Sequence, residues 1–580
     1  MENIHLNTIQ RFFLMLKAYK KEVSLTYLYA IFGGLLNLVL PLGIQTSLNL
    51  LQAGTISSSW YLIVLIVTLG TVLNGAILIM QASVNETLQK KIFTDMSFDF
   101  ATRIPKIDLE NTRDMHLPEM VNRFFETLTL TKSVPKILSD LTAAVLQIFF
   151  GLILLSFYHP YFIVLDVVLT LILFSILRLT SPSGLKTNIK ESKFKYEVVY
   201  WLEELGRTVA TFKHGAHSDY GVKKTDKLVS NYLDAKTQHF EILKIQSWSF
   251  VFFKTLITFI LLVLGGFLVL RNQINIGQFV ASEIVIILVI NASEKLILLM
   301  ETIYDVLTSL DKIGHVMDIP LEATSTEKVL QKSGMAVTLN NLGYTFAHTD
   351  KPTLSHIDLV INPLERVCIA GYNASGRTTL IHIIASFLKP QQGGILFDGI
   401  PMDNYDLASL RSKIGYFSST EQIFSGTLRE NITLGDDSID TETVVSYLSG
   451  VGLTNFLGEI QGGLNAILLP DGKNLSRSIV SKILIARSLA SRPKILLIEN
   501  LLNNLQANDK EKVIEIITSE NRTWTLVCAS DDLEIASRCD KIIILDKGNI
   551  VAQGSFEEIK KSIHFNQVFK TIKTHLKAQT

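Results

Sequence analysis

The chain carries a long interval without charge near its N-terminus, and this interval limits the possible folds more than any other feature. No Asp, Glu, Lys or Arg occurs from residue 23 to residue 85. A helix needs about 20 mainly apolar residues to cross the hydrocarbon core of a bilayer, so the interval is long enough for two crossings. We therefore predict membrane spans at residues 23–45 and 60–81, joined by an uncharged loop at residues 46–59.

Four further apolar segments bring the predicted spans to six. They occupy residues 138–157, 161–179, 248–270 and 279–300. The connections after the second and fourth spans are long and rich in lysine and arginine, whereas the other connections are short. Because basic loops stay on the cytoplasmic side, we expect a multi-pass protein of the plasma (inner) membrane. Both termini would be cytoplasmic, and the lipid bilayer would surround the spans.

Other polar features of this half leave alternatives open. Residues 7–22 are basic and amphipathic, which favours a helix lying along the cytoplasmic leaflet; the alternative is that they form the first turns of the next helix. Asp166, Glu283 and Asn291 fall within predicted spans. Asp166 could have a functional role, or it could be a hydrogen-bonded or hydrated acid near the membrane interface. Glu283 and Asn291 could line a polar translocation path, or they could join contacts between helices.

The composition changes near residue 336. From there, short β-branched runs alternate with amphipathic helices, which is typical of an α/β domain with a mainly parallel sheet. We predict an N-terminal helix at 1–22, a membrane domain at 23–311, a polar linker at 312–335 and an α/β domain at 336–580. The hydrophobic content of 48% fits a membrane protein, and the balance of 54 basic and 54 acidic residues gives no reason to expect nucleic acid.

The α/β part contains the outline of a phosphate-binding loop, G-x-x-x-x-G-K-[ST], between an apolar strand and a helix. Glycines let backbone N–H groups converge on an anion, and the helix N-terminus adds positive potential. Arginine stands where the motif has lysine, and it keeps the charge on a wider, planar group. The candidate nucleotide-binding residues are Gly371, Asn373, Ala374, Ser375, Gly376, Arg377, Thr378 and Thr379.

Three further blocks show that the chain resembles the ATP-binding cassette exporters of the half-transporter type. They are IGY at 414–416 with IFSGTLRENI at 423–432, IARSL at 485–489 with RPKILLI at 492–498, and DKII at 540–543 with DKG at 546–548 and Gly554. The resemblance covers nearly the whole chain. It implies a membrane domain of six helices with the ABC-exporter fold, followed by an α/β P-loop nucleotide-binding domain.

The resemblance also identifies functional positions, and this chain departs from the family at most of them. The family's adenine-stacking aromatic residue falls on Phe346, and the serine of its signature falls on Ser476. Its water-orienting glutamine, metal-holding aspartate, catalytic glutamate, loop aspartate and switch histidine fall on Ser419, Glu499, Asn500, Gln506 and Ser530.

These departures imply that the cassette is degenerate, because an asparagine cannot act as a general base. Binding of ATP and Mg²⁺ at reduced strength is still compatible with the loop, with Thr378 and Glu499 as the metal ligands. Little or no hydrolysis is expected, and no catalytic residue is expected to be competent.

In this family two cassettes meet head to tail, which implies a homo- or heterodimer with another half-transporter. Our leading hypothesis is an exporter subunit that works with a catalytically competent partner. The alternatives are a non-transporting membrane sensor or scaffold, and a homodimeric exporter with a remodelled catalytic site. No peptidase domain precedes the spans, so we expect no cleavage of a peptide leader, and the cargo stays open.

Overall fold

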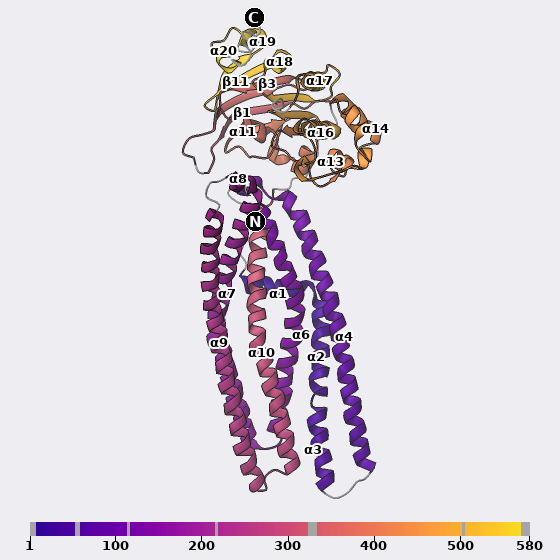
Figure 1. Ribbon diagram of the computed structural model, residues 1–580, viewed down its shortest axis with the longest axis vertical. Coiled ribbons are helices and arrows are strands. Elements are labelled where there is room, and N and C mark those ends of the chain that lie inside the picture. The colour runs from indigo at the N-terminus through magenta and orange to yellow at the C-terminus, as the bar shows by residue number, and fades with distance from the viewer. Residues whose placement is uncertain are drawn as a thin grey trace. The chain divides into compact units, whose positions relative to one another are not determined.

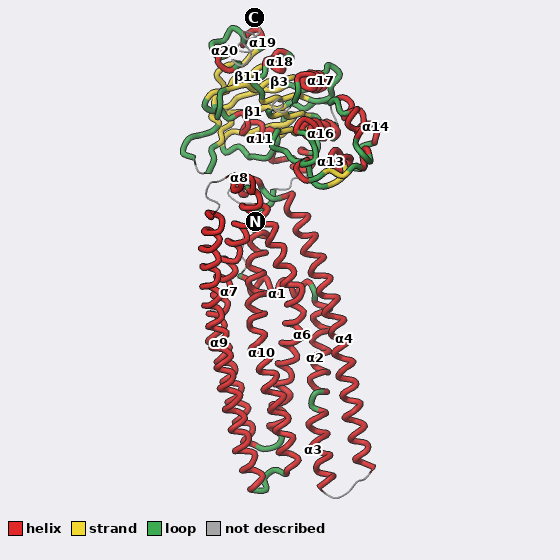
Figure 2. The backbone as a smooth tube through the Cα atoms, in the orientation of Figure 1, coloured by secondary structure: helices red, strands yellow, loops and turns green. Residues whose placement is uncertain are grey.

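The computed structural model describes residues 7–52, 58–112, 117–214, 219–322, 327, 333–347, 349–500 and 505–569. Contacts between residues divide the chain into two compact units. One unit comprises Met1–Ile107 and Thr112–Pro320, and the other comprises Asp108–Asn111 and Leu321–Thr580. The first is built from helices, and the second combines helices with sheets (Figure 1, Figure 2).

Long helices that run side by side form the first unit (Figure 1). Its helices are α1 (Thr8–Ala18), α2 (Lys20–Leu36), α3 (Val39–Gln52), α4 (Ser58–Arg103), η1 (Ile104–Lys106), η2 (Leu109–Thr112), α5 (Leu117–Asn122), η3 (Arg123–Phe125), α6 (Glu126–Ser156), α7 (Pro160–Arg207), α8 (Val209–His214), α9 (Asp219–Leu270) and α10 (Ile276–Met317). Residues 109–111 of η2 belong to the second unit.

The first predicted span is divided between α2 and α3, which are separated at residues 37–38. Pro41 lacks the N–H that would bond to the carbonyl four residues earlier, and a proline at this place interrupts a helix. The side chain of Asn37 accepts a hydrogen bond from Nδ2 of Asn74 on α4 at 3.0 Å. Helix α3 continues to Gln52, so the loop that we predicted from residue 46 is in part helical. Its leucines continue the apolar pattern, and no charge ends the helix there.

Five helical segments, the first made of α2 and α3 together, are long and apolar enough to cross a membrane among the residues that the structure describes. They contain the first five predicted spans, except that the third ends at Ser156, one residue before its predicted end. The sixth, residues 279–300, lies in α10, which packs against α3, α6, α7 and α9. Helices α6 and α10 approach closely at Gly151, where a Cβ would lie 2.6 Å from Cγ2 of Val289. Small residues at such contacts are typical of helices that pack together in membranes.

Helix α4 shows how the apolar surface of this unit is used. Leu65, Val72 and Ile79 lie seven residues apart and expose 63, 64 and 74% of their surface. Seven residues make nearly two helical turns, so these side chains lie along one side of the helix. An apolar strip without protein contacts is what a lipid-facing helix surface requires.

The N-terminal segment forms a separate helix, α1, and not the first turns of α2. Asn7 and Gln10 form a capping box at its start, and the helix ends at Tyr19. Met15 and Tyr19 are buried against the first unit, whereas Phe13 exposes 64% of its surface. The location of α1 along a membrane leaflet remains a prediction.

The polar residues of the spans differ in their surroundings. Asp166 of α7 accepts a hydrogen bond from Oγ of Ser156 of α6 at 3.0 Å, which agrees with the alternative of a hydrogen-bonded acid. Glu283 has a buried Oε1 with no hydrogen-bond partner in the described part of the chain. Asn291 is exposed.

The second unit is organised around a six-stranded sheet with the order β12-β11-β3-β10-β9-β6. All neighbours in it are parallel except β12, which runs antiparallel to β11. Its strands are β3 (Arg366–Gly371), β6 (Ile414–Ser418), β9 (Ile495–Glu499), β10 (Thr525–Ala529), β11 (Lys541–Asp546) and β12 (Asn549–Gly554).

An antiparallel sheet with the order β2-β1-β4-β5 and a short hairpin of β7 with β8 accompany it. Their strands are β1 (Val337–Tyr344), β2 (Leu354–Ile361), β4 (Gln392–Phe397), β5 (Ile400–Pro401), β7 (Gly426–Thr427) and β8 (Ile467–Leu468). The helices of this unit are α11 (Arg377–Ile384), η4 (Met402–Asn404), α12 (Leu407–Arg411), α13 (Leu428–Thr433), α14 (Thr441–Gly450), α15 (Thr454–Glu459), η5 (Gly463–Asn465), η6 (Pro470–Gly472), α16 (Arg477–Ala490), α17 (Ala507–Thr518), α18 (Leu533–Ser537), α19 (Phe556–Ile559) and α20 (Phe565–Val568).

The central strands β3, β10 and β9 of the six-stranded sheet are buried on both faces, as their apolar sequences require. Along β3, Cys368 and Ala370 belong to one apolar cluster, and Val367 and Ile369 belong to the other. Successive side chains of a strand point to opposite faces, so the sheet lies between the two clusters. This central position makes β3 a rigid base for the loop that follows it.

The predicted linker at residues 312–335 is only in part an irregular connector. Helix α10 continues into it as far as Met317. Residues 323–326 and 328–332 of this segment lie outside the described residues.

Candidate nucleotide site

The ends of four neighbouring parallel strands bring the predicted site residues to one edge of the main sheet. The strand registers place Ile369, Ala529, Glu499 and Ser418 next to one another across β3, β10, β9 and β6. Each lies at or near the carboxyl end of its strand. Ligands of open parallel sheets bind at this edge.

The loop between β3 and α11 has backbone conformations that its sequence explains. Gly376, at the N-cap of α11, has a φ of +97°, and Ala374 has a φ of +58°. A Cβ on Gly376 would lie 2.7 Å from Cδ2 of Leu354 and 2.8 Å from the carbonyl oxygen of Thr353. Only glycine fits there without strain. The loop combines backbone N–H groups with a helix N-terminus, which are the two elements of a phosphate site.

A cavity of about 830 Å³ is lined by this loop, from Asn373 to Thr379, and by segments near β2 and β12. Arg377, Lys351 and Lys547 line it, and no Asp or Glu does. A concave surface with three positive side chains and no carboxylate attracts anions. The backbone N–H of Gly548 donates to the carbonyl oxygen of Ser375 at 3.1 Å and so attaches the loop to the turn that carries Lys547.

Two side chains of the loop have unused capacity for an anion. The hydroxyl of Ser375 is buried, with the residue 2% exposed, and has no hydrogen-bond partner among the described residues. Arg377 is half-buried and makes no hydrogen bond or ion pair with any residue that the structure describes. A buried polar atom without a partner is costly, so both groups fit the phosphates of a nucleotide.

Glu499 is the centre of a polar cluster at the end of β9. It is 4% exposed, and its Oε1 accepts a hydrogen bond from the hydroxyl of Thr378. Its Oε2 accepts one from the Tyr416 hydroxyl at 3.3 Å and lies 3.9 Å from Nε2 of His382. Burial, together with the charges of Glu499 and Glu421, raises the pKa of Tyr416, so the phenol stays a hydrogen-bond donor.

The Thr378 hydroxyl and the Glu499 carboxylate together fit Mg²⁺, which prefers oxygen ligands. No group of three or more His, Cys, Asp or Glu that could hold a metal occurs in the described part of the chain. Mg²⁺ usually completes its coordination with water and substrate phosphates. A bound ion would supply charge neutralisation at the phosphates.

The three positions that would activate water carry no base or acid. Asn500 follows β9 with a φ of +53°, is exposed, and donates its backbone N–H to the carbonyl oxygen of Ala529 at 3.3 Å. Ser530 follows β10, is 8% exposed, and accepts a hydrogen bond from the Asp532 N–H at 3.2 Å. Ser419 is exposed in the turn after β6. The cluster can therefore hold an ion and orient phosphates, but these three side chains cannot take a proton from water.

Two protein families match the chain. The family described as ABC transporter transmembrane region matches residues 23–293, and the family described as ABC transporter matches residues 354–503. The two matches together span more than half of the chain. It belongs to the ABC transporters. The order of the matches is that of a half-transporter, with the membrane domain first.

Curated relatives of this ABC half-transporter include bacterial translocation and flippase proteins. It is 26% identical over 359 residues to the Toxin RTX-I translocation ATP-binding protein of Actinobacillus pleuropneumoniae, a match that covers 62% of this chain and 51% of that protein. It is 26% identical over 289 residues to the ATP-dependent lipid A-core flippase of Burkholderia orbicola, which covers 50% and 49%. The chain spans about half the length of the curated relatives it matches.

A solved structure shares the fold of the half-transporter. It is a bacterial Atm1-family ABC exporter with ATP bound, and the match has a TM-score of 0.86, covers 95% of this chain and 98% of that chain, and has 16% sequence identity. This match and the two families confirm the predicted fold class, a helical membrane domain of the ABC-exporter fold followed by an α/β nucleotide-binding domain.

The remaining predicted residues of the half-transporter lie outside the cavity. Phe346 is half-buried and packs edge to face against Tyr344, with ring centroids 5.1 Å apart. Ser476 caps α16, because its hydroxyl accepts from the Ile479 N–H at 3.3 Å. Gln506 is the exposed N-cap of α17. None of the three is among the residues that line the cavity, and their roles remain predictions.

Sequence reasoning missed three charged residues near the site. Lys351 and Lys547 line the cavity, and the signal for Lys547 was its place in the Asp-Lys-Gly turn between β11 and β12. Glu421, two residues after Ser419, has a buried Oε2 without a hydrogen-bond partner in the described residues. Burial raises the pKa of Glu421 to about 7, although the charge of Arg487 opposes the shift. No family motif points to Glu421.

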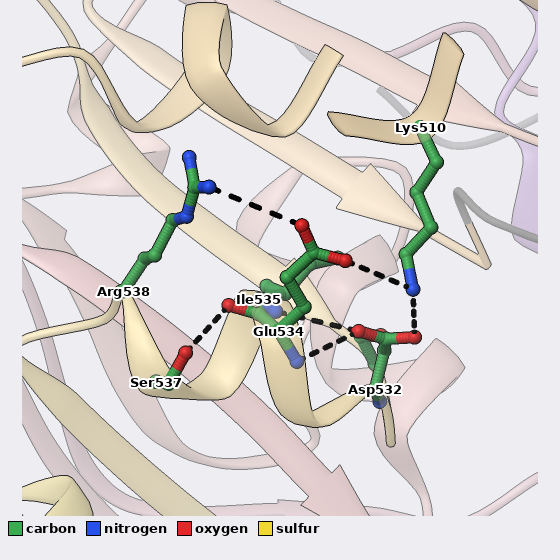
Figure 3. A network of polar contacts seen from close by, with 7 residues as sticks. Lys510, Asp532, Glu534, Ile535, Ser537 and Arg538 are labelled. Atoms are coloured by element: carbon green, nitrogen blue, oxygen red, sulfur yellow. Dashed lines mark hydrogen bonds and ion pairs between the residues drawn. The ribbon is translucent and has the colours of Figure 1, made fainter. Parts of the chain in front are cut away.

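The segment after Ser530 is held by an ion-pair network (Figure 3). Lys510 of α17 lies 2.6 Å from a carboxylate oxygen of Asp532 and 3.3 Å from one of Glu534. Asp532 also caps α18 by accepting from the Glu534 N–H at 2.9 Å. Arg538 lies 3.9 Å from Glu534. The network fixes the backbone on which the switch histidine of the family would stand, although the side chain there is serine.

Proposed function

We propose that this chain is an exporter subunit whose cassette binds ATP with Mg²⁺ but contributes little or no hydrolysis, and that it works with a catalytically competent partner. The single observation that carries this proposal is the neutral amide of Asn500, directly after Glu499 of β9, whose carboxylate accepts a hydrogen bond from Thr378 at the end of the phosphate loop. Phosphoryl transfer to water depends on positioning of the water and on neutralisation of charge. The chain keeps groups for the second task and lacks the family's groups for the first.

The residues divide this work as follows. The loop around Gly376 and the free guanidinium of Arg377 would hold the phosphates. Lys351 and Lys547 add positive potential to the cavity. Thr378 and Glu499 would hold Mg²⁺. Nothing in this division of roles needs the side chain at residue 500 to accept a proton.

The signature segment suggests where a partner would enter. Ser476 and Arg477 are exposed and lie outside the phosphate cavity. If cassettes meet head to tail, this segment would face the phosphate loop of the partner, and the partner's signature would cover the cavity described above. A heterodimer would then contain one competent set of catalytic side chains, and a homodimer would contain none.

The decisive experiment separates binding from turnover. The chain is purified from its native membrane, its associated proteins are identified, and ATP binding and phosphate release are measured on the same sample. We expect a second half-transporter with intact catalytic residues and phosphate release that depends on that partner. Recovery of homodimers alone would contradict the role of a partner. Nucleotide binding without turnover in any complex would instead favour a sensor or scaffold.

A remodelled catalytic site is the second candidate, and Glu421 favours it. Its carboxyl group has a pKa of about 7, which suits a general base. It also lies close enough to Tyr416 to raise the pKa of that phenol. In this case the purified homodimer would hydrolyse ATP, and Glu421→Gln would abolish the activity. Full activity in that variant would remove the second candidate.

The relatives suggest two classes of cargo for this proposal. One is named for the translocation of a toxin and one for flipping of a lipid. A secreted polypeptide and a lipid are therefore the first cargoes to test in vesicles that contain the purified complex.

A further inference from the structure

A second large cavity lies within the helical unit, remote in sequence from the nucleotide site. Its volume is about 780 Å³, and residues of α5, η3, α7, α9 and α10 line it. Sites for organic ligands usually have volumes of about 300–1,000 Å³. On α7 the cavity begins at Lys193, and on α10 it begins at Lys312. Both positions lie beyond the predicted spans, on the parts of these helices that we expect to be cytoplasmic.

Positive charge predominates in this cavity. Arg123 and Glu119 form an ion pair at 3.3 Å, so their charges cancel. Three lysines remain, Lys193, Lys224 and Lys312, against one unpaired carboxylate, Glu197. Counting only the lysines, the arginine and the carboxylates of the lining, the unbalanced charge is two positive units. A ligand with two negative charges would neutralise it.

Lys312 supplies one of these positive charges. It makes no hydrogen bond or ion pair with any residue that the structure describes, although it is half-buried. Burial lowers the pKa of Lys312, against the opposing effect of the neighbouring Asp311 charge. On the same wall, Nε of Arg123 is buried without a hydrogen-bond partner among the described residues. Buried cationic donors without partners are costly to the fold unless an anion binds to them.

The rest of the lining is apolar and aromatic. The walls include the side chains of Tyr196, Tyr200, Met120 and Leu228. A hydrated inorganic ion would gain no binding energy from such apolar surfaces. Trp201 is buried, and its ring holds the Lys224 ammonium at 3.9 Å from the ring centroid. This cation–π contact keeps a positive charge at the edge of the apolar surface. The cavity thus combines lysine side chains on different helices with apolar and aromatic walls.

We propose that this cavity is a binding site for an organic dianion with a planar, apolar body. The anionic groups would pair with Lys312 and Lys224, and the body would lie against Tyr196, Tyr200 and Met120. The proposal is independent of the proposed function of the cassette, because all of these residues belong to the helical unit and none of them is among the residues that line the nucleotide cavity. Such a site would make the transporter responsive to a cytoplasmic metabolite or would admit an anionic cargo.

The test uses the purified full-length protein in detergent micelles and isothermal titration calorimetry. The probe is naphthalene-1,5-disulfonate, with naphthalene-1-sulfonate and inorganic sulfate as comparisons. We expect saturable binding of one disulfonate per chain, at least tenfold weaker binding of the monosulfonate, and no saturable binding of sulfate. Lys312→Gln and Lys224→Gln should each weaken binding of the disulfonate at least tenfold.

A matched control and two outcomes make the test decisive. Lys190→Gln removes an exposed lysine of α7 that does not line the cavity, and it should change the affinity less than twofold. Absence of saturable binding, or equal losses in the Lys190 and Lys312 variants, would overturn the proposal. It would also be overturned if Lys312→Gln changed the monomer–dimer equilibrium in sedimentation and left disulfonate binding intact, because a second copy of the chain would then be the occupant.

Discussion

The two sides of the nucleotide site differ in whether backbone groups or side chains would contact the nucleotide and water. On the β3 side, the phosphate loop acts mainly through its backbone and depends on glycine at residue 376, where a φ of +97° and close neighbours exclude other residues. On the β9 and β10 side, the family acts through side chains, and this chain has Asn500 and Ser530 there. The backbone side is preserved, and the side-chain side is altered.

This difference shows which property can be lost without loss of the fold. With asparagine at residue 500, strand β9 keeps a continuous parallel register with β10. Replacement of Gly376 would disturb the packing of Leu354 and hence β2. Under the proposed function, nucleotide binding depends on a glycine that the fold also needs, whereas hydrolysis depends on side chains that the fold does not need.

The largest expected effect comes from restoring the altered side. In Ser419→Gln/Asn500→Glu/Ser530→His, phosphate release should rise about 100-fold over the matched variant that carries Asn500→Gln in place of Asn500→Glu. General-base catalysis contributes about 10² to 10⁴ in rate, and only the first variant contains the base. Phosphate release from the purified transporter at saturating ATP measures it. Equal rates in the two variants would mean that the activity does not depend on a base at residue 500.

The sequence predicted much of the fold and only part of the nucleotide site. The charge-free interval and the basic loops predicted the helical unit, and glycine spacing predicted the loop, because both signals follow from backbone and solvent physics. The position of Asn500 came from the family resemblance. Lys351 and Glu421 could not be predicted in this way. They reach the site or its neighbourhood through the packing of distant strands and helices, which no local pattern of residues reports.

Damage to the backbone side should be almost as large. Gly376→Val should weaken ATP binding by about 100-fold, because its side chain would meet Leu354 and the Thr353 carbonyl at 2.7 and 2.8 Å and would move the loop. The matched control is Gly399→Ala, which also has a positive φ, +83°, but has no atom within 4 Å of an added Cβ. It should cost about 1 kcal/mol in stability and leave ATP affinity unchanged. Titration with a fluorescent ATP analogue, together with thermal unfolding, distinguishes the two.

A smaller effect is expected where a side chain assists the backbone. Arg377→Ala should weaken ATP binding about tenfold, since it removes a charged donor from the cavity, and Arg377→Lys should retain most of the affinity. Arg492→Ala, which alters an arginine outside the cavity, serves as the control. Calorimetric titration with ATP and Mg²⁺ gives the three affinities. An unchanged affinity in Arg377→Ala would show that the backbone alone carries the binding.

The smallest expected effect concerns Glu421, whose carboxyl group is buried shortly after the end of β6. The pKa of Glu421 is raised from its ordinary value to about 7, so the folded state favours its protonated form. Its burial is therefore tolerated below about pH 4.5, becomes increasingly destabilising as the pH rises from about 4.5 to about 7, and carries a constant penalty above that. Glu421→Gln should stabilise the protein at pH 8 by on the order of 1–3 kcal/mol and have little effect near pH 5. Thermal unfolding at both pH values measures this, and a gain that is equal at pH 5 and pH 8 would show that Glu421 is charged in the folded protein throughout this range.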